Sequence, residues 1–140
     1  MAYLDTSVLA AYYCPEPLST AVQRRLGRAE AFAISPLVEV EFHSALAAKV
    51  RTGDLAAVAA ARVRDLFRQH LADNCYGFLS IGAPEYALAR DWLGQFSTPL
   101  RALDAIHLAT AYINGLAILT TDKGLARAAT HFGVRSELIA

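Results

Sequence analysis

Residues 1–10 read MAYLDTSVLA, and the acidic residue Asp5 interrupts two apolar runs in this stretch. Residues 2–4 are typical of a short buried strand, so Asp5 lies where a strand gives way to a helix. An acid at such a junction can cap the helix, because its oxygens accept hydrogen bonds from free backbone N–H groups. The carboxyl end of a parallel strand is also where open α/β sheets bind ligands. Both interpretations of Asp5 are open at this point.

Outward from this stretch, short apolar runs alternate with segments of helical periodicity. Strands are expected at residues 2–4, 31–34, 78–81 and 117–120, with an edge strand at 134–136. Helices are expected at residues 19–28, from 36 to about 51, from a cap at Asp54 to about 73, at 84–96, from the 97–99 loop to about 113, and at 122–131. This alternation predicts a three-layer α/β/α fold in which helices flank a short parallel sheet of four to five strands.

Length and composition indicate one domain over residues 1–140. The chain is 55% hydrophobic, and its thirteen basic residues balance its thirteen acidic ones, so net charge does not indicate nucleic-acid binding. No apolar run approaches the roughly 18 residues of a membrane span, and no secretory signal is evident, so we expect a cytoplasmic protein without a membrane partner. The two cysteines, Cys14 and Cys75, lack metal-ligand spacing and are expected to be free thiols.

Three further acidic residues occupy positions where a carboxylate is unexpected. Asp122, in AILTTDKGL, follows the strand expected at 117–120 and has the same two interpretations as Asp5. Glu41, in SPLVEVEFHSAL, and Asp104, in LRALDAIHLATAY, fall among apolar residues at helical spacing and so face the buried side of their helices. A buried carboxylate needs a cation, a set of hydrogen bonds or a proton. Helical spacing alone does not show that the four acids meet.

The four acidic segments, in this order, resemble the motifs of the PIN domain, and in particular of the VapC-type toxin ribonucleases. The resemblance extends over nearly the whole chain and implies the PIN-like fold. It implies that the site acids, which would hold Mg²⁺ or Mn²⁺, are Asp5, Glu41, Asp104 and Asp122, and that the supporting hydroxyls are Thr6, Ser7 and Thr120. It further implies endonucleolytic hydrolysis of RNA, leaving a 5′-phosphate and a 3′-hydroxyl.

The residue types agree with this chemistry. Carboxylates without several Cys or His ligands favour a hard cation over zinc, and such an ion can activate water and neutralise charge at a phosphate. Arg101 and Lys123 flank acidic segments and are candidates for contact with RNA phosphates. His107 lies one turn after Asp104, where we expect a core or supporting position rather than a metal ligand.

The resemblance also implies partners, namely a second copy of the chain and a cognate VapB-type antitoxin. Two other functions stay open: a housekeeping PIN nuclease of RNA processing, and a PIN module that binds RNA or protein without cutting. An aspartyl phosphatase of the haloacid dehalogenase type requires a second Asp two residues after the first, and this position is Ser7. We therefore discount that class.

Overall fold

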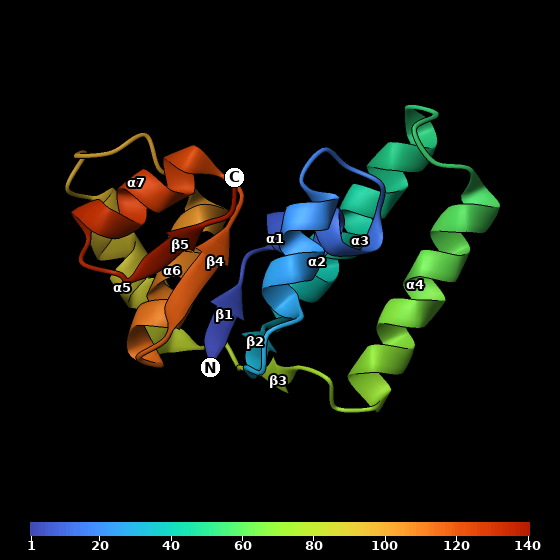
Figure 1. The fold of residues 1–140 in the computed structure, drawn as a ribbon. Coiled ribbons are helices and arrows are strands. Elements are labelled where there is room, and N and C mark those ends of the chain that lie inside the picture. The colour runs from blue at the N-terminus through green and yellow to red at the C-terminus, as the bar shows by residue number, and fades with distance from the viewer.

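A computed structural model describes all of residues 1–140 as five strands and seven helices (Figure 1). The strands are β1 (Ala2–Leu4), β2 (Phe32–Ile34), β3 (Gly77–Phe78), β4 (Ala117–Thr120) and β5 (Ser136–Leu138). The helices are α1 (Thr6–Tyr13), α2 (Ser19–Leu26), α3 (Pro36–Arg51), α4 (Ala57–Ala72), α5 (Ala83–Leu93), α6 (Ala102–Ile113) and α7 (Lys123–His131). Each helix is too short or too polar to serve as a membrane span.

The strands form one parallel sheet in the order β3-β2-β1-β4-β5. From β1 the chain steps outward to β2 and β3, then returns across the sheet to β4 and steps the other way to β5. Because parallel crossovers are right-handed, this reversal places the connecting helices on opposite faces. Figure 1 shows α1 to α4 on one side of the sheet and α5 to α7 on the other. The predicted three-layer fold is confirmed.

The reversal occurs between β1 and β4, which pair in register, Tyr3 with Ile118 and Leu4 with Leu119. The two strands are central and almost completely buried. Their carboxyl ends therefore finish level with each other, in the crevice where doubly wound sheets bind ligands. Asp5 is the first residue after β1, and Asp122 is the second residue after β4.

Helix α3 begins where the sequence predicts. Ser35 is its N-cap, and its Oγ accepts a hydrogen bond from the Val38 N–H at 3.4 Å, while Pro36 occupies the first turn. A proline is favourable there because the first-turn N–H groups have no intrahelical partner. Helix α4 begins at Ala57, three residues after its predicted cap Asp54. Asp54 therefore does not cap this helix, and its side chain accepts a hydrogen bond from the Thr52 hydroxyl.

Two strand positions predicted from the sequence are wrong. Strand β3 is Gly77–Phe78 rather than 78–81, because it pairs only with the last two residues of β2. Strand β5 is Ser136–Leu138 rather than 134–136, because the Val134 N–H bonds to the Ala129 carbonyl and closes the end of α7. Both strands lie at sheet edges, where one neighbour is missing and hydrophobic alternation is weak.

Candidate functional site

Four acidic side chains come from four different elements that meet at the carboxyl edge of the sheet. Asp5 follows β1 and Asp122 follows β4, whereas Glu41 projects from the second turn of α3 and Asp104 from the first turn of α6. All four acids named from the sequence are therefore carried by elements that reach this edge. How each carboxylate is held differs from one acid to the next.

Asp5 is buried, with 6% of its surface exposed. Its backbone occupies the N-cap position of α1, but its side chain makes no capping hydrogen bond. Instead, Oδ2 accepts hydrogen bonds from Ser7 Oγ at 2.7 Å and from Thr120 Oγ1 at 2.9 Å. The helix-cap interpretation of Asp5 is therefore wrong. A buried carboxylate held by two hydroxyl donors stays fixed in one orientation.

Asp122 does act as a helix cap. Its Oδ1 accepts hydrogen bonds from the backbone N–H groups of Gly124 at 2.8 Å and Leu125 at 3.2 Å, at the start of α7. Thr120 connects it to Asp5, because the Thr120 hydroxyl that donates to Asp5 also accepts from the Asp122 N–H at 3.0 Å. The two acids at the ends of β1 and β4 are thus tied together through one hydroxyl.

Glu41 is half-buried and uses a single oxygen for its contacts with the protein. Oε1 accepts a hydrogen bond from Thr6 Oγ1 at 2.8 Å and a second from His107 Nε2. Burial raises the pKa of Glu41, but the bonds from His107 and Thr6 outweigh it, so the net pKa lies below the usual value. Glu41 is consequently an ionised carboxylate at neutral pH.

Asp104 makes no hydrogen bond to the protein, and its pKa is raised. Burial is the main cause, followed by the negative charge of Asp5; His107 opposes these effects, and Asp122 and Glu41 add smaller contributions that raise the pKa. The negative charges of all three other acids therefore act on Asp104. Carboxylates gathered in this way repel one another unless a cation is present.

The oxygen atoms of the cluster fit a hard cation. Asp5, Glu41 and Asp122 each engage one oxygen with protein donors, and their other oxygens, with both of Asp104, make no protein hydrogen bond. In this side-chain arrangement, no three acidic, His or Cys side chains lie close enough to enclose one ion. A Mg²⁺ ion commonly contacts only one or two protein carboxylates and completes its octahedron with water and substrate oxygens.

The remaining residues singled out in the sequence divide into two groups. Thr6, Ser7 and Thr120 each donate a hydrogen bond to a site acid. Arg101 is exposed and, together with Asp104 and Asp122, lines a small hollow of about 150 Å³. Lys123 is exposed at the start of α7 but does not line this hollow.

The structure adds two residues that the sequence does not reveal as part of the site. Tyr3 and Ser35 are fully buried, and the Tyr3 hydroxyl lies 2.7 Å from Ser35 Oγ and 2.7 Å from His107 Nδ1. His107 is itself fully buried and contacts Glu41. The only signal in the sequence is that Tyr3, in a buried strand, has a hydroxyl that needs a partner.

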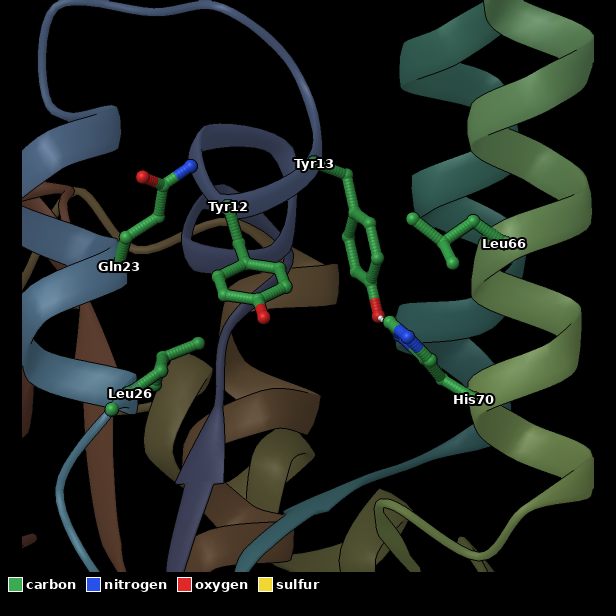
Figure 2. Close-up of a pocket in the computed structure, with 7 residues that line it drawn as sticks. Tyr12, Tyr13, Gln23, Leu26, Leu66 and His70 are labelled. Carbon is green, nitrogen blue, oxygen red and sulfur yellow. Dashed lines mark hydrogen bonds between the residues drawn. The ribbon is translucent and has the colours of Figure 1, made fainter.

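A second cavity, of about 450 Å³, lies between α1, α2 and α4, away from the acids (Figure 2). Tyr12, Tyr13, Leu26 and Leu66 contribute to its apolar walls. Figure 2 shows the Tyr13 hydroxyl directed toward His70, and the distance from this hydroxyl to Nδ1 is 2.6 Å. No acidic side chain lines this cavity.

The fold and the acidic edge together define a class of protein: a three-layer α/β domain that collects carboxylates where its central parallel strands end. The family model of the PIN domain matches residues 2–130 of the sequence. The chain therefore belongs to the PIN domain family. No curated protein matches its sequence.

Solved structures of other proteins share the fold. FitAcB from Neisseria gonorrhoeae is 22% identical, with a TM-score of 0.69 over 97% of this chain and 96% of that chain. VapC20 from Mycobacterium tuberculosis, a toxin that cleaves the sarcin-ricin loop, is 22% identical, with a TM-score of 0.70 over 91% and 95%. VapBC2 from Rickettsia felis, bound to a fragment of promoter DNA, is 16% identical, with a TM-score of 0.72 over 100% of both chains.

Proposed function

We propose that the protein is a metal-dependent endoribonuclease that hydrolyses phosphodiester bonds in RNA, and that it acts as the toxin of a toxin–antitoxin pair. One observation carries the nuclease part. Three of the four carboxylates hold one oxygen on protein donors and leave the other free, and free carboxylate oxygens are the ligands that a hard cation prefers. The site acids in this proposal are Asp5, Glu41, Asp104 and Asp122.

A bound Mg²⁺ or Mn²⁺ would lower the pKa of a water molecule and neutralise charge developing on the scissile phosphate. The protein's own residues orient the site. Ser7 and Thr120 fix the Asp5 carboxylate, while Thr6 and His107 fix that of Glu41. Fixed carboxylates avoid the reorganisation that a flexible ligand would require during the reaction.

RNA must approach the site against the repulsion of four carboxylates. Arg101, which shares a hollow with Asp104 and Asp122, is placed to contact a phosphate next to the scissile bond. Lys123 is exposed one residue after Asp122 and would contact the backbone farther out. Both contacts are independent of base identity, so they support affinity for RNA rather than choice of sequence.

The toxin part of the proposal has separate support. The similar structures include VapC20, described as a toxin, and VapBC2, which was solved on promoter DNA. A cognate VapB-type antitoxin and a second copy of the chain are the proposed partners. Large apolar side chains of α3 and α4, namely Val40, Val58 and Leu66, are 49% to 68% exposed and support a contact with another protein.

Cleavage of RNA by the purified protein tests the nuclease function. We expect cleavage in Mg²⁺ or Mn²⁺, its loss in chelator, and a fall of at least about a thousandfold in Asp5→Asn and Asp104→Asn. Asp65→Asn is the matched control, because Asp65 is an exposed acid on α4, remote from the sheet edge. Cleavage by either site variant at the wild-type rate would refute the assignment.

Expression in cells separates the toxin from a housekeeping nuclease and from a module that binds without cutting. A toxin would arrest growth, and co-expression of a neighbouring short reading frame would restore it. A housekeeping nuclease would cleave RNA without arresting growth. A binding module would bind RNA without any metal-dependent cleavage. In a separate experiment, light scattering of the purified chain would test the proposed homodimer.

A further inference from the structure

Three buried polar side chains form a continuous line that ends on the half-buried Glu41 carboxylate. Ser35 Oγ, the Tyr3 hydroxyl and His107 Nδ1 follow one another at 2.7 Å intervals, and His107 Nε2 contacts Glu41 Oε1. Ser35, Tyr3 and His107 are each 0% exposed. Because none of the three is exposed to solvent, their hydrogen-bond partners must be groups of the protein.

The direction of each hydrogen bond follows from counting donors and acceptors. Ser35 Oγ accepts from the Val38 N–H, so its own proton needs an acceptor, and the only one in contact is the Tyr3 oxygen. Tyr3 must then donate to His107 Nδ1 rather than to Ser35. Any other arrangement leaves a buried hydroxyl proton without a partner, which is rare in folded proteins.

The imidazole is consequently restricted to one tautomer. With Nδ1 accepting from Tyr3, the ring carries its hydrogen on Nε2, which faces Glu41 Oε1. Glu41 can only accept when ionised, so this tautomer satisfies both groups. The line therefore runs in one direction, from the N-terminus of α3, through Ser35, Tyr3 and His107, to Glu41 on the second turn of the same helix.

We infer that Tyr3 and His107 are positioning residues: Tyr3 fixes the His107 tautomer and ring orientation, and His107 Nε2–H holds Glu41 Oε1 so that Oε2 stays free for the cation. The link to the cation rests on the proposed function. The tautomer itself does not, because it follows from buried contacts alone. Nearby residues that orient a ligand in this way alter metal affinity about 10- to 100-fold.

Nuclear magnetic resonance of the ¹⁵N-labelled chain tests the tautomer directly. We expect the His107 ring in the Nε2–H form, with its signals identified by their absence in His107→Gln. In Tyr3→Phe, which removes only the hydroxyl, we expect this ring to exchange between tautomers. An Nδ1–H ring in the wild type, or an unchanged ring in Tyr3→Phe, would overturn the inference whether or not the protein binds metal.

Calorimetric titration with Mn²⁺ tests the consequence for the cation. Tyr3→Phe should bind Mn²⁺ about tenfold more weakly than the wild type. Tyr76→Phe is the matched control, since it also removes a tyrosine hydroxyl from a 2.7 Å hydrogen bond, but one remote from the acids, and its affinity should be unchanged. Equal affinities of Tyr3→Phe and the wild type would refute the positioning role.

Two substitutions of His107 separate positioning from packing. His107→Gln keeps an N–H donor within reach of Glu41, whereas His107→Leu keeps the volume and removes the donor. We expect the Leu variant to lose about 100-fold in Mn²⁺ affinity and the Gln variant to recover most of it. If His107→Leu and His107→Gln both fold and lose Mn²⁺ affinity equally, His107 has no positioning role. A wild type that binds no Mn²⁺ would instead refute the proposed metal site, leaving the tautomer measurement to decide the contacts of Tyr3 and His107.

Discussion

Two tyrosine–histidine pairs in this protein are nearly identical locally and differ in what surrounds them. Tyr3 contacts His107 Nδ1 at 2.7 Å, and Tyr13 contacts His70 Nδ1 at 2.6 Å. The first pair is fully buried and continues to the Glu41 carboxylate. The second continues to the Tyr76 hydroxyl and lines the cavity between α1, α2 and α4 (Figure 2).

The effect of each tyrosine–histidine pair depends on the group to which its hydrogen bonds lead. A bond to a charged acceptor is worth about 1.5–3 kcal/mol, whereas one between neutral groups is worth about 1 kcal/mol. The pair at the sheet edge therefore constrains a carboxylate. The pair at the cavity is surrounded by Phe42 and Phe67, whose ring centroids lie 5.4 Å and 5.7 Å from that of Tyr13, and so belongs to an aromatic cluster.

The largest expected effect is a loss of stability when the aromatic cluster around Tyr13 loses Phe67. Phe67 is completely buried and packs edge-on against Phe42, with ring centroids 4.8 Å apart. Phe67→Ala should lower the free energy of unfolding by about 3–5 kcal/mol in urea titrations, through lost burial and a residual cavity. Leu66→Ala, at an exposed position on the same helix, should change it by less than about 1 kcal/mol. If Phe67→Ala lowered the free energy of unfolding by less than about 1 kcal/mol, the aromatic cluster would not be part of the core.

The next largest effect should come from Thr120 at the sheet edge. Thr120→Val removes the donor to Asp5 and leaves the Asp122 N–H without its acceptor. We expect a loss of about 1–3 kcal/mol in the free energy of unfolding, with a parallel fall in RNA cleavage. Thr130→Val, at an exposed position of α7, serves as the control. If the two variants were equally stable, the hydroxyl of Thr120 would have no special role.

A smaller loss of stability is expected when Tyr13, which pairs with His70 at the cavity, loses its hydrogen bond to Tyr76. Tyr76→Phe removes the hydroxyl that contacts Tyr13. Thermal and urea unfolding should show a loss of about 0.5–1.5 kcal/mol, since neither partner is charged. RNA cleavage should be unchanged. A change in cleavage per folded molecule would show that the two regions are coupled.

The smallest expected effect is a gain in stability rather than a loss, and it follows substitution of Asp104. The pKa of Asp104 is raised by burial and by the other acids, so its folded state binds a proton more tightly than its unfolded state. Its ionisation therefore weakens the fold as pH rises through the folded pKa, and this penalty is absent below the unfolded value. In chelator at neutral pH, Asp104→Asn should raise Tm by roughly 2 °C, or about 0.5 kcal/mol.

Scanning calorimetry at several pH values checks the sign of the Asp104 effect. The gain in Asp104→Asn should disappear as the pH falls below about 4, where the wild-type carboxyl is also neutral in both states. Asp65→Asn, at an exposed position, should show no such dependence. A variant that is less stable than the wild type at neutral pH would show that the ionised Asp104 stabilises the fold.

Local signals predicted the central parts of the fold well. The strands at residues 2–4 and 117–120 are observed as predicted, and Ser35 with Pro36 begins α3 as its capping chemistry indicates. The edge strands β3 and β5 were displaced from the predicted positions by a few residues. Central strands are buried on both faces and so have a strong apolar signal, whereas edge strands depend on a single neighbour.

Periodicity and capping signals act over a few residues, so the sequence alone predicts acids at two strand ends and on the buried sides of two helices. The same signals leave Asp5 and Asp122 each open to two interpretations, a helix cap or a site acid. Contacts between distant segments distinguish them: the Asp122 side chain caps its helix, whereas that of Asp5 is held by Ser7 and Thr120. The tertiary structure also joined Tyr3 to His107, 104 residues away, because partners of buried polar groups are chosen by packing between distant segments.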